Sequence, residues 1–242
     1  MQNKTILITG AARRIGAHCA RHLHHLGANI IIHCHHSVDE AGQLADELNH
    51  IRPNTTKVIQ GDISNYQHLE DIAEQARRAF GQLNVLINNA STFYPRTFGD
   101  NNLDDWQSLV GSNMQGPFFL SQHLKKDLQQ DQGVIINMLD IHAQSPLKNH
   151  TLYCMAKAAQ AMMTKSLALE LAPDIRVNGI APGAIMWPEN SMDNQTKQEI
   201  LAQIPMTELG SAEDIAQAIS YLIQAPYVTG QILSIDGGKS LN

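Results

Sequence analysis

The stretch "LYCMAK" at residues 152–157 holds a tyrosine and a lysine four residues apart. Residues i and i+4 lie on the same face of a helix, so Tyr153 and Lys157 would face the same way. A phenol has an ordinary pKa of about 10, and a neighbouring ammonium favours its charged form. The pair therefore predicts acid–base chemistry, although the spacing alone also suits an exposed helix face.

An aspartate, Asp140, stands thirteen residues before Tyr153. An ionised carboxylate can only accept hydrogen bonds, so it suits a partner that carries N–H groups, and in its protonated form it can pass on a proton. Asp140 therefore points to a substrate with ring nitrogens. The alternative is that position 140 has lost a catalytic residue.

The sequence "TGAARRIG", residues 9–16, follows an apolar run. Gly10 permits a tight turn from strand to helix, and Gly16 permits close packing of that helix on the sheet. Free N–H groups at the helix start would then face a pyrophosphate. The usual middle glycine is replaced by Arg14, so the motif alone also fits an ordinary turn.

Short apolar runs alternate with helical patterns along the chain. Near-continuous apolar runs suit strands buried on both faces of a parallel sheet. The alternation predicts an α/β fold, a single doubly wound Rossmann-type parallel sheet of about seven strands with helices on both faces, formed by one domain over residues 1–242. Expected strands are 5–10, 29–34, 56–62, 84–90, 133–139, 175–183 and 231–238; expected helices are 13–26, 38–50, 66–80, 103–130, 151–172 and 211–224.

A polar excursion over about 184–210 interrupts this alternation and contains Pro188 and Pro205. It follows a strand end, which is where open α/β sheets bind ligands, so we expect a substrate-binding flap there rather than only a surface insertion.

The composition narrows the function classes. The net charge is −6 and no basic run occurs, which argues against nucleic acid or an anionic membrane as a partner. No apolar stretch is long enough to span a membrane, and the N-terminus lacks a signal-peptide pattern. The three cysteines are scattered without metal or disulfide spacing, and no metal site is expected. We expect a cytoplasmic protein with a small-molecule substrate.

The glycine turn, "NNA" at 88–90 and Tyr153-x-x-x-Lys157, in this order over the whole chain, resemble the short-chain dehydrogenase/reductase family. The resemblance implies binding of NAD(P)H and hydride transfer. The family's catalytic Asn, Ser, Tyr and Lys fall on Asn113, Asp140, Tyr153 and Lys157, so an aspartate stands where the family has serine.

Four stretches, "TGAARRIG", "HCHHS", "NNASTFYP" and "LDIHAQSPL", resemble the pteridine reductases within that family. The resemblance implies NADPH-dependent hydride transfer to a pterin such as biopterin or dihydrobiopterin, with dihydrofolate or dihydromonapterin as further candidates. It also implies a homotetramer. Residues expected to contact the substrate are Arg14, Ser91, Phe93, Asp140, Tyr153 and Trp187, with Met186 and Glu189 nearby.

The choice of NADPH also has a basis in the residues. NAD enzymes place a carboxylate about twenty residues beyond the glycines, whereas this chain has His36 there. His35, His36 and Ser37 could instead donate hydrogen bonds to a 2'-phosphate. The expected cofactor contacts are Gly10, Arg13, Arg14, Ile15, Gly16, His35, His36, Ser37, Asp62, Asn89, Ala90, Ser91, Lys157, Pro182 and Gly183.

Two other functions stay open at this point. One is a ketoreductase that acts on acyl or other carbonyl substrates, and Asp140 and Phe93 count against it. The other is a catalytically weak protein that binds NADPH.

Overall fold

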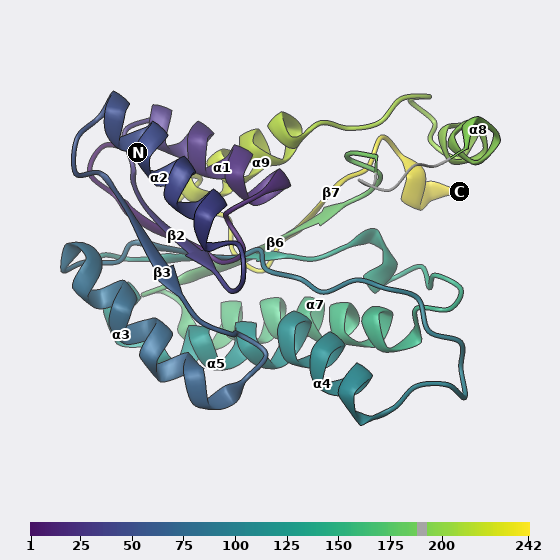
Figure 1. Ribbon diagram of the computed structural model, residues 1–242, viewed down its shortest axis with the longest axis horizontal. Coiled ribbons are helices and arrows are strands. Elements are labelled where there is room, and N and C mark those ends of the chain that lie inside the picture. Colours follow the sequence, from purple (N-terminus) through teal and green to yellow (C-terminus); the bar gives the residue numbers. More distant parts are fainter. Residues whose placement is uncertain (188–192) are drawn as a thin grey trace.

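The computed structural model describes residues 1–187 and 193–242, and its strands form one seven-stranded sheet. All neighbouring strands are parallel, in the order β3-β2-β1-β4-β5-β6-β7. The predicted doubly wound Rossmann-type α/β fold is therefore confirmed (Figure 1). The strands are β1 (Thr5–Ile8), β2 (Asn29–Cys34), β3 (Thr56–Gln60), β4 (Val85–Asn88), β5 (Val134–Met138), β6 (Arg176–Pro182) and β7 (Ile232–Ile235).

Helices cover both faces of the sheet. In Figure 1, α1, α2 and α9 lie above the sheet, and α3, α4, α5 and α7 lie below it. The helices are α1 (Arg14–His25), α2 (Val38–Ile51), α3 (Leu69–Phe80), α4 (Leu103–Val110), α5 (Gly116–His123), α6 (Lys125–Gln129), α7 (Thr151–Leu171), α8 (Asn194–Ala202) and α9 (Ala212–Gln224). Short turns are η1 (Tyr66–His68), η2 (Gly111–Gln115), η3 (Ile141–Ala143) and η4 (Lys239–Leu241).

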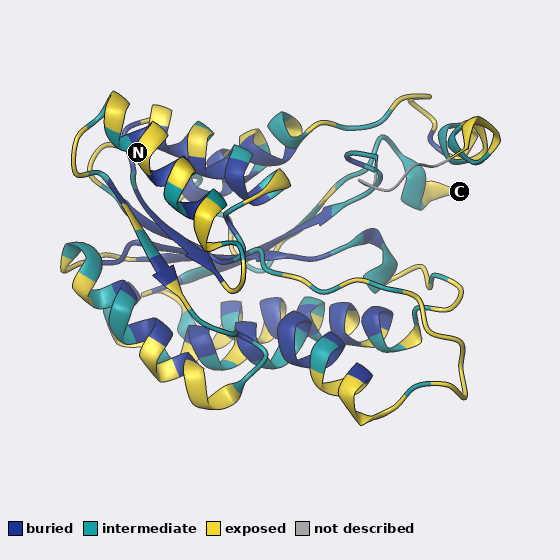
Figure 2. Ribbon diagram, in the orientation of Figure 1, coloured by how far each residue is buried: buried dark blue, intermediate teal, exposed yellow. Residues whose placement is uncertain are grey.

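The core has two main parts, one on each side of the sheet. Alternate residues of a strand point to opposite faces, so Ile6 packs with α1, α2 and α9, whereas Leu7 packs with α3 and α5. The central strands are buried along their length (Figure 2). Because both faces are covered, these strands need apolar side chains at consecutive positions, and this produces the runs seen in the sequence.

The chain is helical over most of the expected span 103–130, but a π turn and a break near Leu124 interrupt the regular α-helix. α4, α5 and α6 are separate helices, and the π-helical turn η2 joins the first two. Within η2, Asn113 Nδ2 donates to Leu109 O at 2.9 Å. In the first turn of α5, Pro117 has no N–H with which to continue the helical ladder. Such single π turns are frequent at functional sites.

The expected flap over 184–210 contains a helix, α8, that the pattern did not indicate. The Asp193 carboxylate caps α8 by accepting from Thr196 N at 2.9 Å. No residue of α8 is buried, so the helix lacks the apolar periodicity that identifies the others. Pro188 and Glu189 lie outside the described residues.

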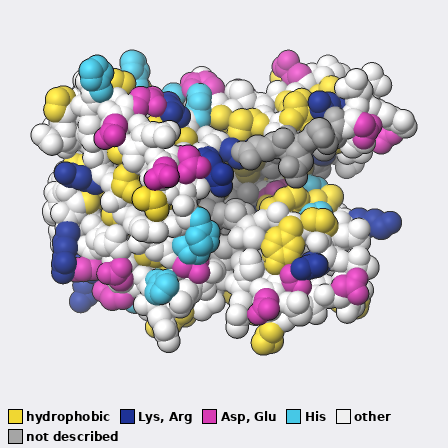
Figure 3. Space-filling model, viewed as in Figure 1, with side chains coloured by type: hydrophobic (Ala, Val, Ile, Leu, Met, Phe, Trp, Pro, Cys, Tyr) yellow, Lys and Arg dark blue, Asp and Glu magenta, His cyan; other side chains and the backbone are white. Residues whose placement is uncertain are grey.

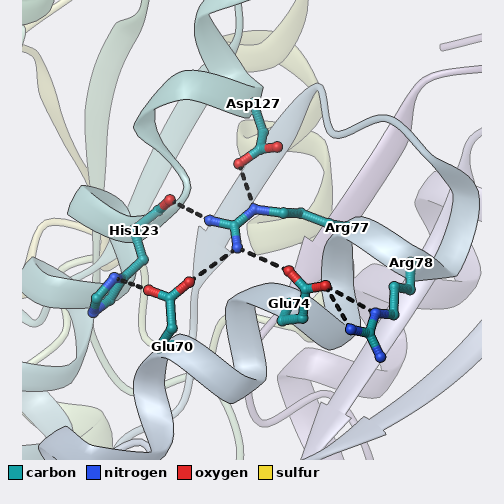
Figure 4. Close-up of polar contacts among 6 residues, drawn as sticks. All are labelled: Glu70, Glu74, Arg77, Arg78, His123 and Asp127. Carbon is teal, nitrogen blue, oxygen red and sulfur yellow. Dashed lines mark hydrogen bonds and ion pairs between the residues drawn. The ribbon is translucent and has the colours of Figure 1, made fainter.

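An ion-pair network joins α3 to α5 and α6 (Figure 4). Arg77 on α3 donates to Asp127 at 3.1 Å and to the main-chain oxygen of His123 at 2.7 Å. The same guanidinium pairs with Glu70 and Glu74 on its own helix. These contacts hold α3 against α5 and α6 within the lower helical layer.

Within residues 1–187 and 193–242, no helix is both long and apolar enough to cross a membrane.

Candidate active site

A cavity of about 660 Å³ lies beyond the carboxyl ends of β1, β4, β5 and β6. This is the edge at which parallel sheets bind ligands, next to the point between β1 and β4 where the winding reverses. The cavity opens between the two helical layers, and the space-filling view shows a hollow there beside basic and histidine side chains (Figure 3). Its lining comprises Arg13, Arg14, Ile15, Asn89, Ser91, Phe93, Met138, Leu139, Asp140, Tyr153, Lys157, Pro182, Gly183, Ile185 and Met186.

Asp140 uses its two carboxylate oxygens for different purposes. Oδ1 accepts a hydrogen bond from His142 N at 2.8 Å, which caps the turn η3. Oδ2 accepts from the Tyr153 hydroxyl at 2.7 Å. The thirteen-residue spacing in the sequence thus corresponds to direct contact between the two side chains.

Tyr153 is held in its protonated form. Burial raises the pKa of the phenol far above its ordinary value, and the negative charge of Asp140 and the hydrogen bond to it act in the same direction. The expectation that Lys157 would favour the phenolate is therefore wrong for this arrangement. The Lys157 ammonium lies 5.8 Å from the centre of the Tyr153 ring and donates its hydrogen bond to Met138 O instead of the phenol oxygen.

Lys157 is 2% exposed. Its Nζ donates to Met138 O at 2.6 Å at the end of β5. Burial lowers the pKa of Lys157 from 10.5 to about 8, while the charge of Asp140 opposes that shift. The ammonium therefore loses its proton much more easily than an exposed lysine does.

Asn113 lies behind the cavity wall, where η2 positions it. Its Nδ2 donates to Leu109 O and to Thr92 O, and its Oδ1 accepts from the Ser91 hydroxyl at 2.7 Å. Ser91 itself lines the cavity. The side chain of Asn113 therefore fixes the segment after β4 relative to the α4–α5 turn.

Sequence reasoning missed Gln160, which is 1% exposed. With its amide nitrogen facing the main chain, Gln160 donates to Asn113 O at 3.2 Å and to Met138 O at 3.3 Å. It thereby links η2 to the carbonyl that Lys157 uses. Its position seven residues after Tyr153, on the same helix face, was the available signal.

Phe93 is 53% exposed at the cavity and touches two aromatic side chains. Its ring stacks on His150, with centroids 4.5 Å apart and planes 14° apart. Its ring is nearly perpendicular to that of Tyr153, with centroids 4.8 Å apart. Sequence reasoning missed His150, whose neighbour Phe93 lies far away in the chain.

Trp187 joins the site through its main chain. Arg14 donates to Trp187 O at 3.4 Å, while the adjacent Met186 lines the cavity. The Trp187 ring instead lies under Lys197 of α8, whose Nζ is 5.6 Å from the ring centre. Glu189 is outside the described residues.

A second cavity of about 550 Å³ continues from the first along the start of α1. The two share Arg13, Arg14, Ile15, Asn89 and Ser91, so together they form one elongated trough. The second cavity is lined by Gly10, Ala12, Arg13, Arg14, Ile15, Gly16, Cys34, His35, His36, Ser37, Asn89, Ala90, Ser91 and Thr92.

This trough fits a dinucleotide. A Cβ on Gly16 would lie 2.5 Å from Gly10 O and 2.7 Å from Asn89 Nδ2, so the start of α1 can approach β4 only because residue 16 is glycine. No side chain caps α1 at Arg13, and the first N–H groups of a helix have no partner within it. These groups and the positive helix end suit a pyrophosphate.

The far end of the trough holds two histidines. The rings of His35 and His36 stack with centroids 3.6 Å apart, and Ser37 lies next to them on the cavity wall. Asp62 is set back from this wall and lies 3.9 Å from His35 Nδ1. Pro182 and Gly183 lie at the other end, where Gly183 N donates to Ile235 O at 2.9 Å.

Most predicted site residues are therefore gathered along one trough. Among the residues that the structure describes, three others lie beside the trough and each contacts a residue of its wall. Asn113 contacts Ser91, and Asp62 lies near His35. The main chain of Trp187 contacts Arg14.

Comparison with known proteins supports the same conclusion. Residues 10–240 match a family described as enoyl-(acyl carrier protein) reductase. The chain is 32% identical to pteridine reductase 1 of Leishmania tarentolae, over 97% of this chain and 96% of that protein. It is 31% identical to 3beta-hydroxysteroid dehydrogenase 1 of Eggerthella lenta, over 100% and 95% of the two chains.

Glucose 1-dehydrogenase 2 of Bacillus subtilis is similar to the same degree, at 31% identity over 100% of this chain and 96% of that protein. These relatives act on chemically different substrates, so identity alone does not select one. What they have in common is the reaction class and the full length of the match. The chain therefore belongs to the short-chain dehydrogenase/reductase family of NAD(P)-dependent oxidoreductases.

Proposed function

We propose that this protein is an NADPH-dependent pteridine reductase. The observation that carries the proposal is the 2.7 Å contact between Asp140 and Tyr153. A carboxylate next to the proton-donating phenol suits a substrate with N–H groups and ring nitrogens better than a simple carbonyl, which needs a hydrogen-bond donor. The 32% identity to pteridine reductase 1 supports this choice.

NADPH, when bound, supplies the hydride. Tyr153, kept protonated by burial and by Asp140, donates the proton from its hydroxyl to a ring nitrogen. The proton that Tyr153 gives up is replaced from solvent by way of Asp140, through the same short contact. Lys157 binds the nicotinamide ribose and assists the proton transfer, and Asn113 steadies a water near Lys157.

The walls of the cavity suit a flat substrate. Phe93 is half-exposed at the cavity, next to the His150 and Tyr153 rings, and aromatic stacking on a ligand adds about 0.5 to 1.5 kcal/mol beyond burial. Ser91 and Arg14 supply polar groups on the same wall, and Ile185 and Met186 of the 184–210 segment close another side. This combination supports a pterin, with biopterin, dihydrobiopterin, dihydromonapterin and dihydrofolate as candidates.

The same trough supports NADPH over NADH. His35, His36 and Ser37 can donate hydrogen bonds to a 2'-phosphate, and position 36 has no carboxylate that would repel it.

The proposal is tested by following NADPH consumption with dihydrobiopterin, dihydrofolate and a β-ketoacyl thioester in parallel. NADH is run as the alternative cofactor, and a 3β-hydroxysteroid and glucose are offered with NADP⁺ in the oxidising direction. We expect turnover on a pterin with NADPH. Turnover confined to the thioester, steroid or glucose would show a different substrate class, and no turnover on any of them would favour a binding protein.

Variants of Asp140 isolate its role. Asp140→Asn keeps an oxygen for the η3 cap but loses the carboxylate, so we expect pterin turnover to fall about 10²-fold with NADPH affinity unchanged. Asp140→Ser restores the usual family residue and is the matched control for folding. Equal pterin turnover in the parent protein, Asp140→Asn and Asp140→Ser would contradict the proposed role of the carboxylate.

We also propose that the protein is a cytoplasmic homotetramer. A groove of about 540 Å³ between α5 and α7 is lined by Phe118 and Met162, which are 40% and 64% exposed. An exposed apolar groove of this kind suits a second copy of the chain. Light scattering should give a mass about four times the chain mass, and Met162→Glu should lower it. An unchanged mass for that variant would place the interface elsewhere.

A further inference from the structure

His33 lies near the carboxyl end of β2, between β1 and β3, and is 1% exposed. Both ring nitrogens have partners. Gly10 N donates to Nδ1 at 3.3 Å, and Nε2 lies 3.1 Å from Gly61 O. A buried histidine with two main-chain partners, just beyond the ends of β1 and β3, is more than a space-filling residue, because an apolar side chain would leave both partners unsatisfied.

The partners fix the tautomer of His33. A main-chain N–H can only donate and a carbonyl can only accept, so Nδ1 carries the lone pair and Nε2 carries the proton. Burial lowers the pKa of His33 to about 4, and nearby His35 adds to this, while Gly61 O and Asp62 oppose it. His33 is therefore a neutral acceptor toward Gly10 throughout the physiological pH range.

Gly10 is the residue at which the chain turns from β1 toward α1. Its φ is +62°, a left-handed conformation that glycine adopts without strain. Its carbonyl accepts from Asn89 Nδ2 at 3.0 Å, and the next N–H, of Ala11, donates to His33 O at 2.9 Å. With His33 Nδ1 on the N–H of Gly10, this peptide segment is held from β2 and β4 at once.

The direction of the turn decides where the following N–H groups point. Ala12, Arg13, Arg14 and Ile15 follow within five residues and line the trough. A rotation at Gly10 would redirect all of them. On the β2 side, two contacts with His33 oppose such a rotation: its side chain accepts from Gly10 N, and its main-chain oxygen accepts from Ala11 N.

We propose that His33 is a positioning residue for the dinucleotide cofactor, acting through Gly10 without touching the ligand itself. The proposal rests on cofactor binding in this trough and not on the identity of the second substrate. Its central element is the acceptor at Nδ1, and the bond to Gly61 has a separate, structural role.

Two polar substitutions test the two ring nitrogens of His33 one at a time. His33→Asn places an oxygen near the position of Nδ1 and loses the Gly61 contact, whereas His33→Gln places its amide near Nε2 and loses the Gly10 contact. We expect His33→Asn to bind NADPH nearly as the parent does. We expect His33→Gln to bind about tenfold more weakly, since it leaves a buried N–H without an acceptor. Titration by the fluorescence of bound NADPH measures both.

His24 provides the matched control. It is also 1% exposed, has a pKa lowered to about 4 by burial, and makes a 2.8 Å contact with Thr55 near the other end of α1. His24→Gln should lower the denaturant midpoint but leave NADPH affinity unchanged. This control distinguishes a general loss of stability from loss of cofactor positioning.

The outcomes are distinct. Parent-like affinity in His33→Asn with weakened binding in His33→Gln supports the proposal. Equal affinity in the two variants, or an equal loss in His24→Gln, overturns it. If the parent protein binds no NADPH or NADH, the proposed function itself fails, whatever the variants do.

Discussion

Two buried groups of the site have pKa values shifted in opposite directions for the same reason. Burial disfavours whichever form is charged, so it raises the pKa of Tyr153 and lowers that of Lys157. Asp140 adds to the first shift and opposes the second. The result is a phenol that keeps its proton next to an amine that gives one up near neutral pH.

Lys157 should therefore limit activity on the alkaline side. It is charged below its pKa of about 8 and neutral above it, so kcat/KM for the substrate should fall as pH rises through about 8. A pH–rate profile measures this. Lys157→Met should remove the alkaline fall in kcat/KM together with most of the activity. A flat profile of the parent protein between about pH 7 and 10 would show that the charge of Lys157 is not required.

At the same scale, sequence reasoning found residues whose neighbours are close in the chain. Tyr153 and Lys157 share a helix face, so their spacing specifies their geometry, whereas Asp140 was found through the resemblance to the family's serine position. His33 and His150 could not be found this way, because their partners Gly10 and Phe93 are brought to them only by the fold. Histidine is also a common surface residue, so its identity alone indicates little.

Elements that face the core were predictable, and elements that do not were missed. Each strand has an apolar run because it is covered on both faces, and the larger helices show an apolar stripe. α8 has no buried residue and therefore no stripe. The division between α4 and α5 depends on hydrogen bonds made by Asn113 to carbonyls of its own helix and of the segment after β4, which no periodicity records.

For the molecule as a whole, buried histidines predict loss of stability in mild acid. His24 and His33 have folded-state pKa values of about 4, against an ordinary value of 6.5. The unfolded chain thus binds more protons between these limits, and the free energy of unfolding falls as pH drops from about 6.5 to 4. His33 alone contributes on the order of 3 kcal/mol to this loss.

Urea unfolding followed by tryptophan fluorescence, at several values between about pH 7 and 4.5, measures the effect. His33→Asn should flatten part of the dependence, because the titrating ring is gone. Carboxylates such as Glu213 titrate at lower pH, because the hydrogen bond to His18 lowers the pKa of Glu213 to about 2. Their protonation therefore produces a separate loss of stability in stronger acid. Constant stability down to about pH 4.5 would contradict the assignment.

The divided task of Asp140 has an evolutionary consequence. One oxygen closes the turn η3, and the other meets Tyr153. Aspartate and serine both make such local caps, so an exchange between them leaves the backbone undisturbed. Within this fold, one exchange at position 140 can therefore add or remove the carboxylate while the turn that carries it is kept.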